Sequence, residues 1–232
     1  MPSHRKLIAV LLFALCASAA QAQNLELDST AQRAKPCEAC HGPEGRATPD
    51  GWYPRIAGKP AGYLYNQLLN FRDGRRHNAA MAYMVDFQRE EFLRELADHF
   101  AAQELPYPMP THVERDAAVL ERGRKLVREG DASREIPACQ ACHGERLTGL
   151  APDVPGLVGL PYDYLVAQFG AWKTGSRRSV EPDCMSTITH QLTPADVAAA
   201  AAFLATTPVP ADSHPQVQSQ ALPQRCGSVS LQ

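Results

Sequence analysis

The chain has 232 residues, enough for one large domain or two small ones, and only 7% of them are aromatic. Its 23 Lys and Arg residues are matched by 25 Asp and Glu residues, with no basic patch or tail in either half. Nucleic acid is therefore not expected as a partner. Because so few aromatic residues leave little bulk for two small cores, a buried apolar group in each half would supply the missing volume.

The first 22 residues have the features of a cleaved signal peptide. A positive stretch at His4-Arg5-Lys6 precedes an apolar run at residues 7–15, which is too short to cross a bilayer. Ala20-Gln21-Ala22 then offers a small-x-small cleavage pattern, so the mature chain is expected to begin near Gln23. We expect export to the periplasm; an uncleaved membrane anchor is the alternative. The mature chain keeps six cysteines and a formal charge of −4.

The rest of the chain shows helical spacing of apolar residues, and no segment alternates with period two for long enough to predict a strand. The sequence therefore predicts an all-α fold. Thr193 is expected as an N-cap before Pro194, and Gly74 and Gly175 are expected just after helix ends. Helices are predicted at residues 25–34, 63–71, 87–102, 116–129, 164–172 and 193–206.

Two copies of one sequence plan lie 101 to 104 residues apart. This predicts two tandem domains, residues 23–105 and 106–207, separated at the proline-rich stretch Leu105–Pro110 and followed by an extended tail at 208–232. Besides the motif C-x-x-C-H-G, the matched residues are Pro54 and Pro155, Tyr63 and Tyr164, Gln67 and Gln168, Arg76 and Arg177, and Met81 and Met185.

The repeated C-x-x-C-H motif is typical of covalent haem attachment. Two thiols three residues apart can each add to one vinyl group of a haem, and the adjacent histidine can ligate the iron. A zinc knuckle or a redox dithiol is the alternative for a single C-x-x-C, but two such sites in an exported, duplicated chain favour haem. We expect two haem c groups. Their attachment residues are Cys37 and Cys40, with ligand His41, and Cys139 and Cys142, with ligand His143.

Each iron also needs a sixth ligand if the protein transfers electrons, and a methionine thioether raises the reduction potential. Met185 is the candidate in the second half. In the first half Met81 competes with Met84, and we favour Met81 because it aligns with Met185 across the repeat while Met84 can serve as packing. His77 and His190 are weaker alternatives that do not recur in the other half.

Other repeated residues are expected to act around the haems. The carbonyls of Pro54 and Pro155 either orient the ligand histidines or merely form turns, and the sequence favours neither. We expect Tyr63, Tyr164, Gln67 and Gln168 to pack on or bond to haem edges or propionates. Arg76 and Arg177 are expected to pair with propionates; the alternative is that they are exposed arginines with no specific role.

Two cysteines lie outside the motifs, Cys184 beside Met185 and Cys226 in the tail. An oxidising compartment favours a disulfide between them, worth roughly 3–4 kcal/mol for a loop of about forty residues. Such a bridge would hold the tail close to the ligand segment of the second haem. Two free thiols are the alternative.

These repeats resemble the tandem dihaem class I cytochromes c, specifically the cytochrome c4 family, over about residues 31–206. The resemblance implies two cytochrome c folds, His/Met ligation of both irons, and electron delivery to a terminal oxidase or another periplasmic acceptor. The donor would be a dehydrogenase or a bc1-type complex, and any membrane association would be peripheral, through such partners. The chain departs from the family in its shorter second haem loop, in Cys184 and in the Cys226 tail.

The sequence therefore predicts a periplasmic electron carrier rather than an enzyme. The alternative is a haem enzyme with a displaceable iron ligand, or an electron-accepting subunit of a periplasmic dehydrogenase complex.

Overall fold

The computed structural model describes residues 29–49, 51–110, 113–217 and 221–230. The predicted signal peptide lies outside these residues. Within them no helix is long and apolar enough to span a membrane. The helices are α2 (Thr30–Arg33), α3 (Lys35–His41), η1 (Pro43–Gly45), α4 (Ala61–Arg72), α5 (Ala79–Val85), α6 (Glu90–Ala101), α7 (Ala117–Arg128), η2 (Ala132–Arg134), α8 (Cys139–His143), α9 (Tyr162–Lys173), α10 (Cys184–Gln191) and α11 (Pro194–Thr206).

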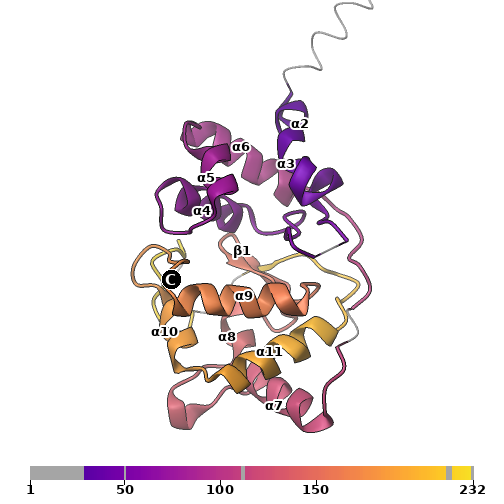
Figure 1. Ribbon diagram of the computed structural model, residues 1–232, viewed down its shortest axis with the longest axis vertical. Helices are drawn as coiled ribbons and strands as arrows, with labels where there is room; N and C mark the ends of the chain where they lie inside the picture. The colour runs from indigo at the N-terminus through magenta and orange to yellow at the C-terminus, as the bar shows by residue number, and fades with distance from the viewer. Residues whose placement is uncertain (1–28, 50, 111–112, 218–220, 231–232) are drawn as a thin grey trace, which may run out of the picture.

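The helices form two groups stacked end to end, α2 to α6 and α7 to α11, and a single linker leads from one to the other (Figure 1). In the first group α4 packs on α6, and Leu93, Leu96, Ala97 and Phe100 form the buried stripe of α6. In the second group α11 packs on both α7 and α9. A mostly helical fold is confirmed.

The last helix of the second group, α11, begins as the sequence predicts. Thr193 caps α11, and its side chain and that of Asp196 form a capping box with the two backbone N–H groups. Gly74 and Gly175 lie just beyond α4 and α9 with φ of 70° and 72°, as expected for glycines at helix C-termini. The last helix of the first group, α6, starts at Glu90 rather than at residue 87, where the sequence predicts it to begin.

The prediction of no strands is wrong for three short ones. β1 (Gly149–Ala151) pairs antiparallel with β2 (Val154–Pro155) and parallel with β3 (Gln216–Val217), in the order β2-β1-β3. Segments of two or three residues are too short to show alternation. β3 belongs to the predicted tail, so part of the tail is held against the second group of helices.

The linker is also tied down rather than free. Arg55 donates to the carbonyls of Leu105 and Pro106 at 2.6 and 3.1 Å, and its guanidinium stacks 4.0 Å from the ring centroid of Tyr107.

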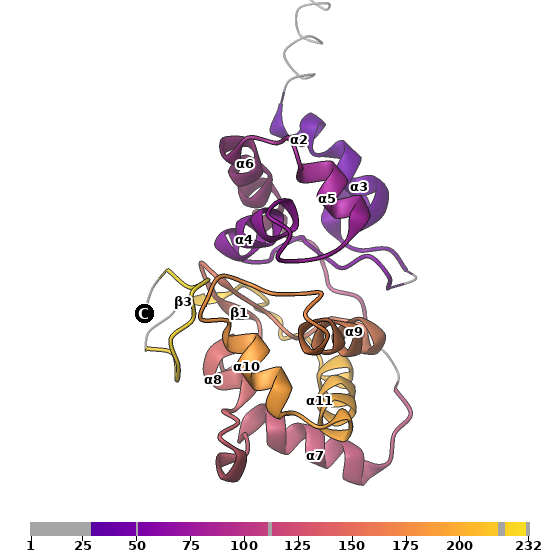
Figure 2. The same ribbon diagram turned by 60° about the vertical axis from the view of Figure 1, so that its left-hand side comes forward.

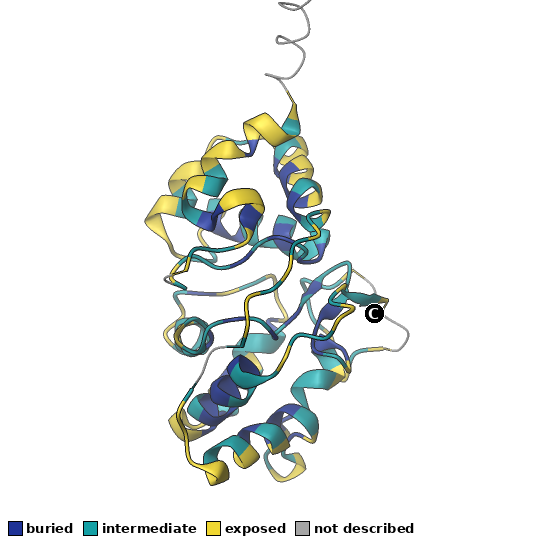
Figure 3. Ribbon diagram, turned by 90° about the vertical axis from the view of Figure 1, so that its right-hand side faces the viewer, coloured by how far each residue is buried: buried dark blue, intermediate teal, exposed yellow. Residues whose placement is uncertain are grey.

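Figure 3 shows the buried residues along the inward sides of the helices and the exposed ones on their outer sides.

Candidate functional site

The two C-x-x-C-H motifs form the short helices α3 and α8, which end at His41 and His143. The four cysteines of the motifs are partly buried and form no disulfide. The glycine after each motif has a positive φ, 75° at Gly42 and 82° at Gly144. A Cβ at Gly42 would lie 2.3 Å from the Ala47 carbonyl oxygen, so only glycine fits this turn.

Each motif histidine is held in the same way. His41 Nδ1 lies 2.8 Å from the carbonyl oxygen of Pro54, and His143 Nδ1 lies 2.7 Å from that of Pro155. A ring nitrogen that donates to a carbonyl fixes the tautomer and leaves the other nitrogen, Nε2, as the metal-facing lone pair. This geometry agrees with the first of the two roles considered for the carbonyls of Pro54 and Pro155, the orientation of the ligand histidines.

Burial also keeps the two imidazoles in the form that binds a metal. It lowers the pKa of His41, and the Pro54 carbonyl offsets part of this effect. Burial likewise lowers the pKa of His143, against the Pro155 carbonyl. The lowered pKa values favour the neutral imidazole, which is the form in which histidine ligates iron.

The candidate methionine ligands lie on two short helices that the sequence pattern does not predict. Met81 is on α5, capped by Asn78, and Met185 is on α10, capped by Asp183. Met81 is partly buried against the cluster of Phe71, Val85 and Leu93, whereas Met84 is 39% exposed. Among the described residues, burial therefore favours Met81 over Met84.

The repeated arginines and glutamines meet across the boundary between the two groups of helices. Arg76 donates to Gln67 and to Gln168, both at 2.9 Å. Arg177 donates to Gln168 at 2.7 Å and to Gln67 at 3.2 Å. Each arginine thus binds the glutamine of its own half and that of the other half.

The backbone continues this two-fold arrangement. Residues 76 and 177 form an antiparallel bridge, flanked by hydrogen bonds from His77 N–H to Ser176 and from Arg178 N–H to Arg75 at 2.8 and 2.7 Å. Equivalent residues of the two copies therefore pair with each other, as in the interface of a symmetric dimer. Sequence reasoning missed this pairing, although the recurrence of the same Gln and Arg in both halves is the signal that points to it.

This boundary holds more buried positive charge than the described side chains neutralise. Arg177 is 6% exposed, and its acceptors are Gln67, Gln168 and the hydroxyl of Tyr63. Burial lowers the pKa of Arg177, and the like charge of Arg76 lowers it further. The buried Lys59 donates to the carbonyl of Gly156 at 3.3 Å. Among the described residues, the hydrogen-bond acceptors of Arg76, Arg177 and Lys59 are neutral oxygens, so no described carboxylate balances these three charges.

The surroundings fit a haem. Trp172 Nε1 is buried and has no hydrogen-bond partner among the described residues, and the Arg177 guanidinium lies 3.8 Å from the Trp172 ring centroid. Haem propionates would supply both the missing acceptor and the missing negative charge. The tyrosines and glutamines expected at haem edges instead contact protein in part: the hydroxyl of Tyr63 accepts from Arg177 at 3.3 Å.

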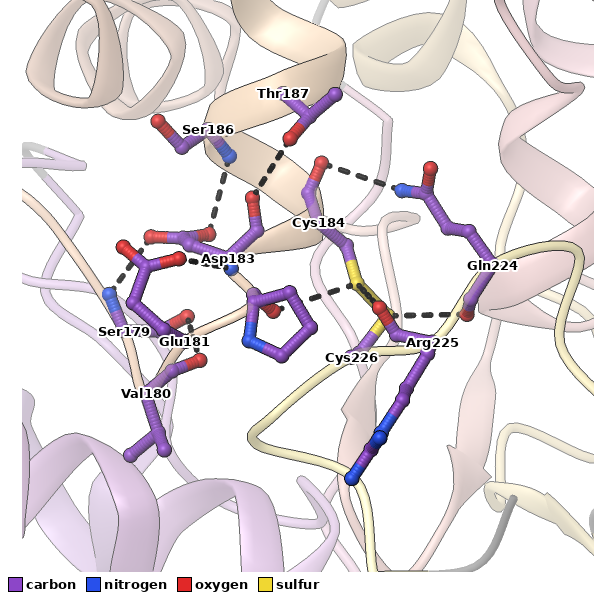
Figure 4. Close-up of a disulfide and its surroundings, with 11 residues drawn as sticks. Ser179, Val180, Glu181, Asp183, Cys184, Ser186, Thr187, Gln224, Arg225 and Cys226 are labelled. Atoms are coloured by element: carbon purple, nitrogen blue, oxygen red, sulfur yellow. Dashed lines mark hydrogen bonds between the residues drawn. A yellow bond between two sulfur atoms is a disulfide. The ribbon is translucent and has the colours of Figure 1, made fainter.

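The predicted disulfide is confirmed. Cys184 and Cys226 are bonded, with Cα atoms 5.4 Å apart (Figure 4). Cys184 is the first residue of α10, directly before Met185.

Comparison with known proteins places these features in one family, although no family model matches the chain. The thiosulfate dehydrogenase electron acceptor of Thiomonas intermedia is 38% identical over 75% of this chain and 79% of that protein. A protein of the same name from Stutzerimonas stutzeri is 33% identical over 85% and 91%. Cytochrome c4 of Pseudomonas aeruginosa is 29% identical over 76% and 87%.

Solved structures agree. Reduced cytochrome c4 from Pseudomonas stutzeri superposes with a TM-score of 0.65 at 25% identity, over 76% of this chain and 95% of that one. Thiosulfate dehydrogenase (TsdBA) from Marichromatium purpuratum gives 0.64 at 31% identity over 75% of this chain, which spans only 36% of that longer chain. The chain therefore belongs to the cytochrome c4 family of dihaem c-type cytochromes, carries two haem c groups and transfers electrons.

Proposed function

We propose that the protein is a periplasmic electron carrier that accepts electrons from a thiosulfate dehydrogenase and passes them to a terminal oxidase or another acceptor. The donor is proposed from two relatives, 38% and 33% identical, each named as the electron acceptor of that enzyme. The signal-like first 22 residues support the compartment. The observation that carries the carrier role is the repeated geometry of motif histidine and proline carbonyl, once in each half.

Within this proposal each half holds one haem. Cys37 and Cys40 attach the first, with His41 and Met81 as iron ligands. Cys139 and Cys142 attach the second, with His143 and Met185. Each haem iron, when bound, takes up and releases one electron.

The chain's own residues prepare these sites. Pro54 and Pro155 fix the ring orientation of the histidines, which tunes the ligand basicity. Arg76, Arg177 and Lys59 place positive charge at the boundary between the halves, where it favours reduced haem because reduction adds a negative charge. The same arginines join the halves, so the two haem sites keep a fixed relation during electron transfer.

A test of the ligand assignment uses the long-wavelength charge-transfer band that a methionine sulfur gives to ferric haem. Met81→Ala and Met185→Ala should each remove about half of this band, and the double variant should remove all of it. Met84→Ala is the matched control for the first half and should keep the full band. Loss of about half of the band in Met84→Ala, with the full band retained in Met81→Ala, would reverse the assignment.

The donor is tested by mixing the purified protein with a thiosulfate dehydrogenase and thiosulfate under anaerobic conditions. Both haems should become reduced, and other dehydrogenases of the periplasm should reduce them more slowly. A haem that stays oxidised in this mixture would contradict the proposed donor.

A second candidate is a permanent subunit of that dehydrogenase. The observation that favours it is the similarity to 36% of the longer Marichromatium chain, which is named thiosulfate dehydrogenase (TsdBA). Size-exclusion chromatography of an equimolar mixture separates the two: a carrier elutes apart from the enzyme, and a subunit elutes with it.

A further inference from the structure

The C-terminal strap, residues 221–230, is bonded to the segment that carries Met185. Cys226 of the strap forms the disulfide with Cys184, and Met185 follows directly in α10. The first group of helices contains no such bridge among its described residues, and Met81 lies on the otherwise equivalent helix α5. The strap is thus a difference between two sites that the repeat makes similar.

The strap also lies directly on the backbone before Met185. The N–H of Gly227 donates to the carbonyl of Pro182 at 3.0 Å, and a Cβ at Gly227 would lie 2.2 Å from the carbonyl oxygen of Glu181. On the other side of the bridge, the Gln224 side chain donates to the Cys184 carbonyl at 3.4 Å. This close backbone approach leaves no space for a side chain at residue 227, so the strap packs directly against segment 181–184.

The same segment is held from within by Asp183, as Figure 4 shows. This buried carboxylate accepts from the backbone N–H groups of Ser179 at 2.7 Å and of Ser186 at 3.0 Å. The start of α10 therefore has an internal anchor, Asp183, and an external one, the strap.

The far end of the strap reaches the other group of helices. The Ser228 carbonyl accepts from the Asn66 side chain of α4 at 3.0 Å. The Ser230 N–H donates to the Asp153 carboxylate at 2.8 Å, and the Ser230 hydroxyl also bonds to it. Asp153 lies on the β1–β2 loop, whose Pro152 carbonyl accepts from the Tyr63 N–H of α4 at 3.1 Å.

The strap thus connects three parts of the molecule: the Met185 segment, the β1–β2 loop and helix α4 of the first group. Figure 2 shows the C-terminal tail, which includes β3, beside β1 at the level where the two groups meet. A displacement of one group relative to the other would therefore pull on the start of α10.

We propose that the strap is a positioning device for Met185, which holds this thioether at the second haem and thereby raises the reduction potential of that haem above its value without the strap. The proposal rests on the proposed ligand role of Met185. The physical reason is that a thioether is a weak iron ligand whose bond raises the potential, and constraint of the segment removes the entropy that favours its release. Cys226, Gly227 and Asn66 act here through Met185 and contact no reacting atom in the proposal.

The test uses the holoprotein with Cys184→Ser and Cys226→Ser combined, which leaves no free thiol to bind iron. Each haem is followed separately by the NMR signal of its methionine methyl, assigned with Met81→Ala and Met185→Ala. The electron affinity of the second haem should fall at least tenfold, which is about 59 mV for one electron. The first haem should change less than twofold.

A second variant separates positioning from simple loss of structure. Asn66→Ala breaks only the link to α4, on the side of the first haem. If the strap positions Met185, Asn66→Ala should lower the electron affinity of the second haem by about twofold to fivefold and leave that of the first haem unchanged. A merely local role of Asn66 would shift the first haem instead. Val217→Ala, at a side chain that is 84% exposed, is the control and should shift neither.

Three results would overturn the proposal. Equal potentials in the wild type and both variants, with both methyl signals present, would remove the strap's role and leave the ligand assignment intact. Equal shifts of both haems would indicate a general structural effect. Absence of the Met185 methyl signal in the wild type would instead refute the ligand assignment, and the proposal with it.

Discussion

The two halves of the molecule share their haem-facing features and differ in what supports them. Both have a C-x-x-C-H helix, a histidine bonded to a proline carbonyl and an arginine that binds two glutamines. The last helices of the two halves, α6 and α11, differ. α11 begins with a capping box and the fully buried Asp196, whereas the N-cap residue of α6, Arg89, makes no side-chain cap hydrogen bond. The two halves thus share the residues of the haem sites and differ in the residues that stabilise the helices around them.

The ligand helices differ in the same way. α10 is bonded to the C-terminal strap, while α5 carries Tyr83, which is 84% exposed, and is followed by Phe87, which is 92% exposed. The second half is therefore the more strongly constrained one. Four predictions test this difference.

The largest effect is expected at Asp196. Its carboxylate accepts from Arg122 and from Arg134, the latter at 2.8 Å, and it closes the capping box with Thr193. Asp196→Ala should lower the free energy of unfolding by about 3 kcal/mol, because charged hydrogen bonds and a helix cap are lost together. Glu91→Ala, at an exposed carboxylate in the first turn of α6, should change it by less than about 0.5 kcal/mol. Urea unfolding measures both, and equal effects would contradict the difference.

The next effect concerns the contact of α7 with α11. A Cβ at Gly123 would lie 2.1 Å from the carbonyl oxygen of Ala199, so the two helices approach too closely for a larger residue. Gly123→Ala should cost about 2–3 kcal/mol through overpacking against backbone. The control is Gly170→Ala in α9, where nothing lies within 4 Å; this change should be neutral or stabilising by up to about 1 kcal/mol. A neutral Gly123→Ala in thermal unfolding would show that the helices can separate at no cost.

A smaller effect is expected where the halves are alike. Removing the buried charge in Arg177→Gln should lower the electron affinity of both haems by about tenfold, or about 59 mV each, because a nearby cation favours the reduced form. Arg76→Gln should act in the same direction. Spectroelectrochemical titration measures the two potentials. A shift confined to one haem would show that the boundary is not shared.

The smallest effect is a pH dependence. Burial opposes ionisation of Asp196, but hydrogen bonds from Arg134, Thr193 and Arg122 outweigh it and hold the pKa of Asp196 well below its usual range. A lowered pKa gives stability that is complete above the unfolded value of about 3.9 and is lost as pH falls through the folded value. The difference in unfolding free energy between the wild type and Asp196→Asn should therefore be constant above about pH 5 and shrink below about pH 4. Denaturant titrations across this range test the sign; a difference that grows on acidification would be contrary to it.

Much of the fold follows from the sequence because its signals are local or repeated. The periodic helices, the Thr193 cap and the glycines after α4 and α9 depend on neighbouring residues, and the structure has them. The disulfide also follows, since only two cysteines lie outside the haem motifs after removal of the leader.

What the sequence does not predict depends on distant partners. The paired residues of β1 and β3 are 66 positions apart in the chain, and both strands are too short for a pattern of their own. The helices α5 and α10 have seven and eight residues, fewer than a periodic pattern needs, although Asn78 and Asp183 are recognisable caps. The repeat shows that Arg76 and Arg177 are equivalent, but only the arrangement of the halves brings each to the glutamine of the other.

The central claim is that each half holds one haem with histidine and methionine ligands. A potentiometric titration of the purified protein, followed through the visible spectrum and the methionine charge-transfer band, tests it most directly. We expect two covalent haems per chain by mass, two one-electron steps, and a band whose intensity corresponds to two methionine-ligated irons. A single covalent haem, or a band that accounts for only one iron, would contradict the account.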